Sequence, residues 1–418
     1  MIVPYYGEFL QYPVPLELSY GACSHNCAYC FARLNQRKRK VELKKIMRLL
    51  ANYQNRTTLV AELLKGGYPV VLSNRSDPFA KSNYKYTLPL LEVMTNLNIP
   101  LSFETKTGHG IDDALKFLKP AVWYITVEML DESIAKRIDP GAPLPEQRIA
   151  TVKKIVGYGH KVVVAINPCV PEWLPEPERL IEKLVNAGVS GVWVDQLHLS
   201  HQQMQNATLN EIEAIGDDLI DRAKGRGSSK KREVDRAWVE HVILLAIEAG
   251  LSVFRPGYDK QTDFFNVWHD VYEKCFPTNQ DLVNICFRDG ITPDNPFVVS
   301  DYVDFMMEKL PKGSYTGMRD YVFTGSFALR KLYKLPSGKL NYQQILAFGY
   351  DAGKIKWSPA AMRLFTWCGY TDVDGGKGVY LDENYKLPFM AFVPWGHDEA
   401  YFDDLNDGVI TMLSNNIK

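Results

Sequence analysis

Short apolar runs alternate with segments of helical periodicity over about the first 200 residues of the chain. Six runs rich in aliphatic and β-branched residues predict strands at 14–19, 70–73, 101–105, 121–127, 161–166 and 191–196. The spacing of apolar residues between them predicts amphipathic helices near 41–52, 86–97, 111–118, 146–157 and 176–187. This alternation is typical of an α/β fold with a parallel sheet. Six such units favour a partial (β/α)6 TIM-like barrel over a doubly wound sheet.

The pattern changes after this repeat. Helices are predicted near 208–222 and 234–249, separated by a basic, glycine- and serine-containing loop at 224–232. No further strand–helix repeat is legible beyond Leu251, where aromatic residues become frequent. A chain of 418 residues also exceeds the roughly 250 to 300 at which a single core stops growing. We therefore expect a barrel with a helical extension over 1–254, and a C-terminal accessory domain, of no assigned fold, over 255–418.

Composition narrows the class of protein. The chain is 46% hydrophobic and 23% charged, and no apolar run approaches the roughly 18 residues needed to cross a bilayer. The N-terminus lacks a basic segment followed by an apolar stretch, so we expect no membrane partner, no secretory signal and a cytoplasmic location. A net charge of −1 excludes a globally basic nucleic-acid binder, but basic residues gather locally at 33–45 and 222–236.

Three of the seven cysteines stand close together, directly after the first predicted strand. Cys23, Cys27 and Cys30 have spacings of four and three, which suggests metal binding rather than a disulfide framework. Iron–sulfur clusters usually take four thiolates, so three would leave one iron open to another ligand. The alternatives are a structural zinc site with His25 as fourth ligand, although zinc sites usually have a second pair of ligands further along the chain, or three cysteines that bind no metal.

The CxxxCxxC spacing, with Tyr29 before the last cysteine, resembles the radical S-adenosylmethionine (SAM) superfamily. Over roughly residues 14–200 the chain is similar to the spore photoproduct lyase-like branch, also described as DNA-repair-photolyase-like. The resemblance implies a radical SAM barrel whose cluster loop spans 20–33. It also implies a [4Fe-4S] cluster on Cys23, Cys27 and Cys30, with SAM on its open iron and Tyr29 beside the cofactor. An external one-electron donor of the flavodoxin or ferredoxin type would be required.

Further SAM contacts are implied by the same resemblance. Ser76 and Asp77 are similar to the branch's (S/T)DP segment and would accept hydrogen bonds from the SAM ammonium, although Asp77 before proline also fits an Asx turn. Lys106 is similar to the lysine of the TK(S/T) motif and would pair with the SAM carboxylate, the alternative being a surface lysine. Arg137 would contact SAM, cap a helix or form an ion pair with Asp139.

The chain departs from the branch at one position. Repair enzymes of this branch carry a hydrogen-donating cysteine two residues before the Ser-Asp pair, and Asn74 occupies that place here. An amide has no weak X–H bond to give. Cys169, at the end of the fifth predicted strand, is a candidate replacement, the alternative being a buried small hydrophobic residue.

These observations predict a radical SAM enzyme that acts on a nucleic-acid base or nucleotide, in modification or repair, with DNA or RNA as partner. The basic stretches and the many aromatic residues after 254 are compatible with a phosphate backbone and stacked bases. One alternative is a radical SAM enzyme acting on a small metabolite or peptide. Another is a non-enzymatic metal-cluster protein that binds nucleic acid.

Overall fold

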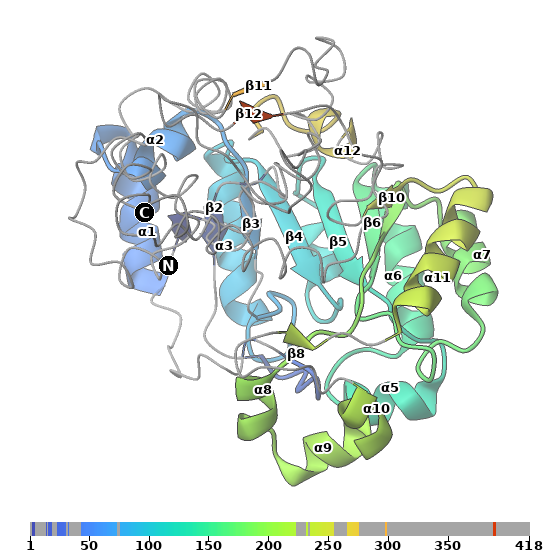
Figure 1. Ribbon diagram of the computed structural model, residues 1–418. Coiled ribbons are helices and arrows are strands. Elements are labelled where there is room, and N and C mark those ends of the chain that lie inside the picture. The colour runs from blue at the N-terminus through green and yellow to red at the C-terminus, as the bar shows by residue number, and fades with distance from the viewer. Residues whose placement is uncertain are drawn as a thin grey trace, which may run out of the picture.

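A computed structural model describes residues 2–4, 14, 16–18, 23–30, 32, 43–72, 76–222, 231–232, 235–254, 266–275, 297–298 and 388–389. Its main feature is an eight-stranded sheet of order β1-β2-β3-β4-β5-β6-β7-β10 (Figure 1). β1 (Ile2–Pro4) is antiparallel to β2, and the other seven strands are parallel.

The parallel strands include all six that the sequence predicts. They are β2 (Leu16–Leu18), β3 (Val70–Leu72), β4 (Leu101–Thr105), β5 (Val122–Thr126), β6 (Lys161–Ile166) and β7 (Gly191–Val194). The seventh, β10 (Val253–Phe254), was not predicted because two residues carry no periodicity. Strand order follows chain order, whereas a doubly wound sheet reverses its order at a switch point. The α/β sheet is therefore consistent with a partial barrel.

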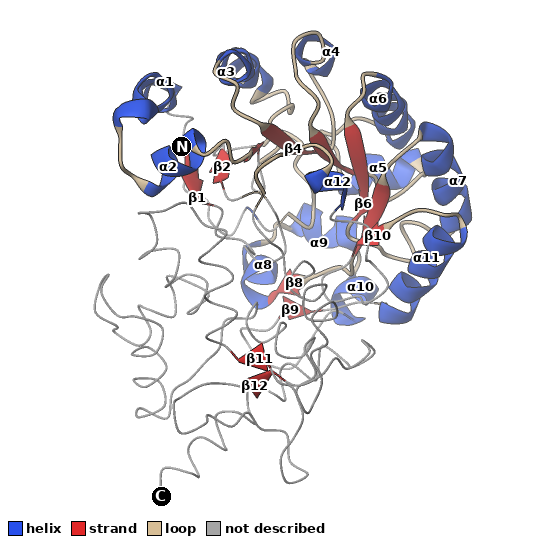
Figure 2. Ribbon diagram, turned by 90° about the horizontal axis from the view of Figure 1, so that it is seen from above, coloured by secondary structure: helices blue, strands red, loops and turns tan. Residues whose placement is uncertain are grey.

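Most helices lie along one side of this sheet, where they form an outer arc (Figure 2). They are α1 (Leu43–Asn52), α2 (Leu59–Lys65), α3 (Tyr84–Asn96), α4 (Ile111–Ala114), α6 (Pro145–Gly157), α7 (Pro177–Ala187) and α11 (Arg236–Glu248). The five helices predicted before residue 190 are present, although α4 ends at Ala114. The seven-residue helices α2 and α5 (Glu132–Ile138) were missed.

The two faces of the sheet differ in composition. Leu101 and Phe103 of β4 join the apolar core beneath the outer helices. Side chains alternate between faces along a strand, so Ser102 and Glu104 point to the opposite, inner face. A second apolar group on the inner face includes Val71, Trp193 and Phe254. The outer face is thus a continuous hydrophobic core, whereas the inner face also carries polar side chains.

A helical extension follows β7. It comprises β8 (Leu199–Ser200), α8 (His201–Asn206), α9 (Leu209–Ile215), α10 (Asp217–Arg222) and β9 (Lys231–Arg232). The single helix predicted near 208–222 is wrong, because Gly216, with φ of 96°, separates α9 from α10. Ala214, Ile215 and Leu219 pack with residues of α5 in a third apolar group.

Little of the predicted accessory domain lies within the described residues. α12 (Asn266–His269), β11 (Phe297–Val298) and β12 (Pro388–Phe389) are its described elements. Trp268 and Tyr272 pack with Phe254 on the inner face of the sheet. The division at residue 254 stays a prediction. Among the described helices, none is both long and apolar enough to span a membrane.

Candidate active site

The cysteine loop (residues 23–30) is held against segments that follow the carboxyl ends of the strands. The backbone N–H of Ala28 donates to the carbonyl of Ile138 at 2.8 Å, and Gln203 Nε2 donates to the carbonyl of Tyr29 at 3.3 Å. Asn26, in the left-handed region with φ of 53°, turns the chain between the cysteines. The loop therefore lies at the end of the sheet where barrel active sites assemble.

The three cysteines fit an iron–sulfur cluster. None forms a disulfide, Cys27 is buried, and Cys23 and Cys30 are partly exposed. Burial, with a contribution from the Asp77 carboxylate, raises the pKa of the Cys23 thiol to about 12, so a bound metal would have to stabilise the thiolate. No group of three or more His, Cys, Asp or Glu side chains in the described part converges on one metal ion. A cubane does not require such convergence, because each thiolate binds a different iron.

His25, the proposed zinc ligand, has both ring nitrogens engaged. Nδ1 donates to the carbonyl of Gly141 at 2.9 Å, and Nε2 lies 3.0 Å from Oδ2 of Asp77. Burial alone would lower the pKa of this imidazole, but the Asp77 carboxylate raises it above its usual value. Each ring nitrogen thus faces an oxygen atom of the protein, the Gly141 carbonyl or the Asp77 carboxylate. The geometry therefore disfavours the zinc site proposed from the sequence.

Asp77 is a junction between the ends of β3 and β4. Its carboxylate accepts hydrogen bonds from the backbone N–H of Phe79 at 2.8 Å, from Thr105 Oγ1 at 2.8 Å and from the backbone N–H of Lys106 at 2.6 Å. The bond to Phe79 is the Asx-type turn considered for this position. Ser76 lies beside it and is buried. The expected contact of Ser76 and Asp77 with the SAM ammonium stays a prediction.

Lys106 is not a surface lysine. Its side chain is 11% exposed, and Nζ contacts Oε1 of Glu128, Oδ2 of Asp139 at 2.8 Å and the hydroxyl of Tyr29 at 2.6 Å. Burial would lower the pKa of the ammonium, but the carboxylates of Asp139 and Glu128 raise it. The Tyr29 hydroxyl in turn donates to Oε1 of Glu128 at 2.6 Å.

Arg148 completes this group, which we call the ion network (Tyr29, Lys106, Glu128, Asp139 and Arg148). Its Nη1 lies 2.9 Å from Oε2 of Glu128, and its Nη2 lies 3.0 Å from Oδ2 of Asp139. Both cations oppose the effect of burial and hold the pKa of Asp139 below its usual value. The network thus pairs two cations with two carboxylates.

Arg137 lies elsewhere. It is exposed near the end of α5, and the arginine that binds Asp139 is Arg148. The ion pair considered between Arg137 and Asp139 is therefore wrong, because the side chain of Arg148 reaches Asp139 from inside the fold. A contact between Arg137 and SAM stays a prediction.

The candidate hydrogen donor Cys169 is fully buried within the outer hydrophobic core, among residues such as Ile166 and Leu174. Its backbone N–H donates to the carbonyl of Asp195 at 2.7 Å. This placement favours the packing role over the catalytic one. Asn74 lies outside the described residues.

Two inner-face acids were missed in the sequence. Glu17 of β2 is buried, and Glu104 of β4 is partly buried, in register with Tyr124 of β5. Burial and the nearby Glu17 raise the pKa of Glu104 to about 8. Within the described part of the chain, Glu104 makes neither a hydrogen bond nor an ion pair. The sequence did offer a signal for these two acids, because each is a glutamate within an otherwise mainly apolar predicted strand.

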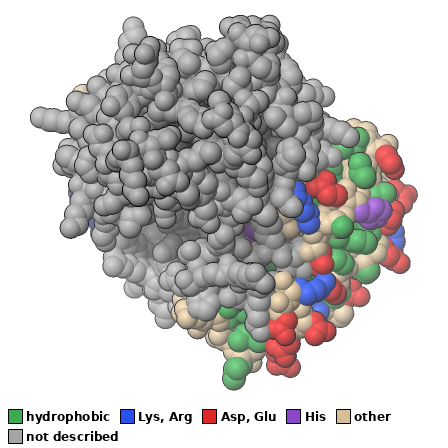
Figure 3. Space-filling model, viewed as in Figure 1, with side chains coloured by type: hydrophobic (Ala, Val, Ile, Leu, Met, Phe, Trp, Pro, Cys, Tyr) green, Lys and Arg blue, Asp and Glu red, His purple; other side chains and the backbone are tan. Residues whose placement is uncertain are grey.

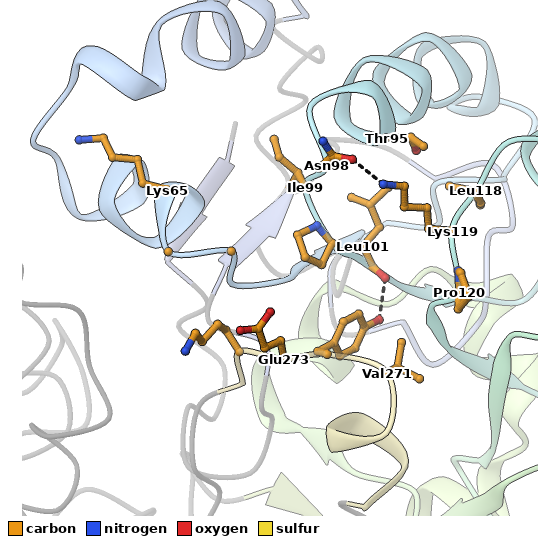
Figure 4. Close-up of a pocket in the computed structure, with 15 residues that line it drawn as sticks. Lys65, Thr95, Asn98, Ile99, Leu101, Leu118, Lys119, Pro120, Val271 and Glu273 are labelled. Atoms are coloured by element: carbon orange, nitrogen blue, oxygen red, sulfur yellow. Dashed lines mark hydrogen bonds between the residues drawn. The ribbon is translucent and has the colours of Figure 1, made fainter.

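A further cavity lies at the other end of the strands. Its volume is about 510 Å³, and it is bordered by residues that precede β4 and β5, including Asn98 and Lys119, with Glu273 opposite (Figure 4). Lys119 bonds Asn98 Oδ1, and the Tyr272 hydroxyl donates to the carbonyl of Leu101 at 2.6 Å. This cavity is at the amino end of the sheet, away from the cysteine loop.

Residues 18–184 match the model of the Radical SAM superfamily. Two relatives share part of the sequence. The uncharacterized protein Rv2578c of Mycobacterium tuberculosis (strain ATCC 25618 / H37Rv) is 25% identical over 202 residues, which are 43% of this chain and 57% of that protein. The uncharacterized protein ORF301 of Acidianus two-tailed virus is 23% identical over 148 residues, 33% and 49% of the two chains. The match thus spans about half of each relative.

Solved structures show weaker overall similarity. SuiB of Streptococcus suis bound to S-adenosylmethionine has a TM-score of 0.39 at 16% identity, covering 64% of this chain and 57% of that one. Spore photoproduct lyase complexed with dinucleoside spore photoproduct has a TM-score of 0.38 at 16% identity, covering 55% and 70%.

The cysteine loop lies at the carboxyl end of a parallel α/β sheet, which is the end where barrel enzymes carry their active sites. By this match, residues 18–184 are similar to enzymes of the Radical SAM superfamily. The family implies a [4Fe-4S] cluster and SAM as cofactors. That Cys23, Cys27 and Cys30 hold the cluster stays a prediction.

Proposed function

We propose that the chain uses its [4Fe-4S] cluster to cleave SAM to a 5′-deoxyadenosyl radical, with a nucleic-acid base or nucleotide as substrate, as in a spore photoproduct lyase-like enzyme. The observation that carries the proposal is the cysteine loop, which lies directly against Asp77 and the ion network. An external donor of the flavodoxin or ferredoxin type would supply the electron.

The chain's own residues prepare this site. Cys23, Cys27 and Cys30 would hold the cluster, and Tyr29 anchors the loop to the ion network. Lys106 would supply positive charge for the SAM carboxylate, and Ser76 lies on the segment expected to hold the ammonium. Because these groups are fixed by buried hydrogen bonds and ion pairs, little reorganisation is needed when the cofactor binds.

Anaerobically reconstituted protein tests the proposal. We expect about four irons per chain and, with SAM and dithionite, formation of 5′-deoxyadenosine. Alanine at any of the three cysteines should abolish both. Stoichiometric zinc without iron, or four irons with no cleavage of SAM, would contradict the proposal.

One structural observation, the location of β9, supports a nucleic-acid substrate. Lys231–Arg232 form β9, whose backbone pairs with β8, and Leu199 of β8 lines a small cavity with Tyr29 and Cys30. A basic segment therefore flanks the cysteine loop. Arg222, by contrast, is paired with Glu172 and Asp235, and charges of both signs are interspersed on the described part of the face in Figure 3.

Replacing Lys230, Lys231 and Arg232 by alanine tests this substrate. The slope of log K against log salt should fall by up to about 0.9 for each duplex phosphate that the variant no longer neutralises, without a change in uncoupled SAM cleavage. Failure to bind DNA or RNA at low salt, or an unchanged slope, would contradict it.

A small metabolite or peptide is the second candidate substrate, and the inner-face acids favour it. Glu104 lies in register with Tyr124, and Glu17 is near enough to raise the pKa of Glu104. The inner face therefore carries two neighbouring carboxyl groups that can accept hydrogen bonds from amines. A substrate amine could stabilise the ionised carboxyl that burial disfavours. Acceleration of SAM cleavage by small amines in wild type, but not in Glu104→Gln, would support this candidate over nucleic acid.

A further inference from the structure

His25 stands between two cysteines of the loop, and its ring nitrogens face the carbonyl of Gly141 and the carboxylate of Asp77. Its side chain is 2% exposed and bridges two segments that are remote in sequence, the turn at Gly141 and the junction at Asp77. The same turn returns a bond, because the backbone N–H of Gly141 donates to the carbonyl of His25 at 2.9 Å. Three interactions therefore fix one residue of the cysteine loop.

Gly141 lies so close to the cysteine loop that no side chain fits at this position. A Cβ atom at Gly141 would lie 2.0 Å from the carbonyl oxygen of Ser24. The loop and the turn thus meet backbone to backbone. Any side chain at position 141 would force the cysteine loop away from the 139–142 segment.

Asp77 connects His25 to the segment that we propose binds SAM. Through Oδ2, Asp77 binds both His25 Nε2 and the backbone N–H of Lys106. A single residue, Asp77, therefore links His25 to the backbone of Lys106. Along the chain, His25 lies two residues from both Cys23 and Cys27.

We propose that His25 is a positioning residue that sets the distance between the cluster and the SAM-binding segment at Ser76, Asp77 and Lys106. The inference rests on the proposed function. The cysteines could hold a cluster without this bridge. SAM, however, would have to reach both the cluster and the residues proposed to bind it, so the distance between them would have to stay fixed. A misplacement of about 1 Å can reduce a rate on the order of a hundredfold.

Two variants disturb the bridge by independent routes. His25→Phe keeps an aromatic ring but removes both the hydrogen bond to Gly141 and the polar contact with Asp77. Gly141→Ala leaves His25 and Asp77 unaltered but displaces the loop. His25→Gln retains hydrogen-bonding capacity and serves as the conservative variant. His160→Phe is the matched control, because His160 is a buried histidine that accepts a backbone hydrogen bond from Ala121 at the other end of the sheet.

Each full-length variant is reconstituted, and its iron content, its affinity for SAM by equilibrium dialysis and the EPR spectrum of its reduced cluster with and without SAM are measured. We expect His25→Phe and Gly141→Ala to retain their iron, to bind SAM about tenfold or more weakly and to lose the spectral change that SAM causes. His25→Gln should recover part of the affinity, and His160→Phe should match wild type.

Wild-type affinity and an unaltered SAM-dependent spectrum in His25→Phe would overturn the inference. A loss of iron in His25→Phe that fully accounts for the loss of SAM binding, with no recovery in His25→Gln, would also overturn it in favour of a purely structural role. Wild-type protein that holds four irons and binds no SAM would instead overturn the proposed function, and the inference with it.

Discussion

Lysines stand at both ends of the central strands, in opposite surroundings. Lys106 follows β4 at the carboxyl end and is buried between two carboxylates and Tyr29. Lys119 precedes β5 at the amino end, where it is exposed and touches Asn98 (Figure 4). Burying a charge costs solvation free energy unless partners are built around it. The carboxyl end has such partners already in place, whereas the amino end leaves its charges to water.

Removal of Arg148 should give the largest effect. Arg148→Met leaves Glu128 and Asp139 buried with only Lys106 to neutralise them, so we expect a loss of about 3–5 kcal/mol in the free energy of unfolding. Urea denaturation of the metal-free protein measures it. Arg179→Met, which removes an exposed arginine from its pair with Glu176, should change stability by less than about 1 kcal/mol. Equal losses of stability in Arg148→Met and Arg179→Met would contradict the burial of the ion network.

Lys106→Met should act on cofactor binding. A charge-assisted hydrogen bond is worth roughly 1.5–3 kcal/mol, so SAM should bind about ten- to a hundredfold more weakly while the cluster stays intact. Equilibrium dialysis and iron analysis on one preparation separate the two properties. Unchanged affinity would remove Lys106 from the SAM site and leave it a structural role.

Glu104→Gln should alter the pH dependence of stability. The folded pKa of about 8 lies above the ordinary value of 4.5, so folding favours the neutral carboxyl. That contribution is fully present below about pH 4.5, is lost as the pH rises towards 8, and then levels off. Melting temperatures of wild type relative to Glu104→Gln should fall across this range. Glu182→Gln, an exposed change on α7, should show no such trend, and a flat difference for Glu104 would contradict its burial.

Lys119→Ala should have the smallest effect. An exposed side chain away from a buried network usually changes stability by less than about 0.5 kcal/mol, and SAM affinity should not change. A larger loss of SAM binding would contradict the contrast between the two ends of the sheet.

The sequence predicted the strands well because burial of their apolar side chains leaves a local pattern. Lys161–Ile166 is one uninterrupted apolar run after its first residue, and its bounds agree with the prediction. Short elements leave too little pattern, as in α2, α5 and β10. Gly216 within an apparently continuous helix was the available signal for the break between α9 and α10.

The sequence predicts the candidate site only at the residues that belong to a recognisable motif. Spacing predicts that the three cysteines bind a cluster, which stays a prediction, but it could not show that His25 faces Asp77. The choice of Arg148 over Arg137 as the partner of Asp139 depends on how α5 and α6 direct their side chains in the folded chain. Such long-range pairings are set by tertiary packing and leave no local periodicity.

The tethers of the cysteine loop also bear on the order of assembly during synthesis. Residues 23–30 emerge early from the ribosome, yet their partners Ile138, Gly141 and Gln203 follow more than a hundred residues later. Pairing segments of such sequence separation is slow, because the entropy of the intervening chain must be given up before the new bonds form. The cysteine-bearing segment therefore lacks some of its contacts until residue 203 has been made. Delivery of iron and sulfide to a correctly shaped loop is consequently a late event in the maturation of this protein.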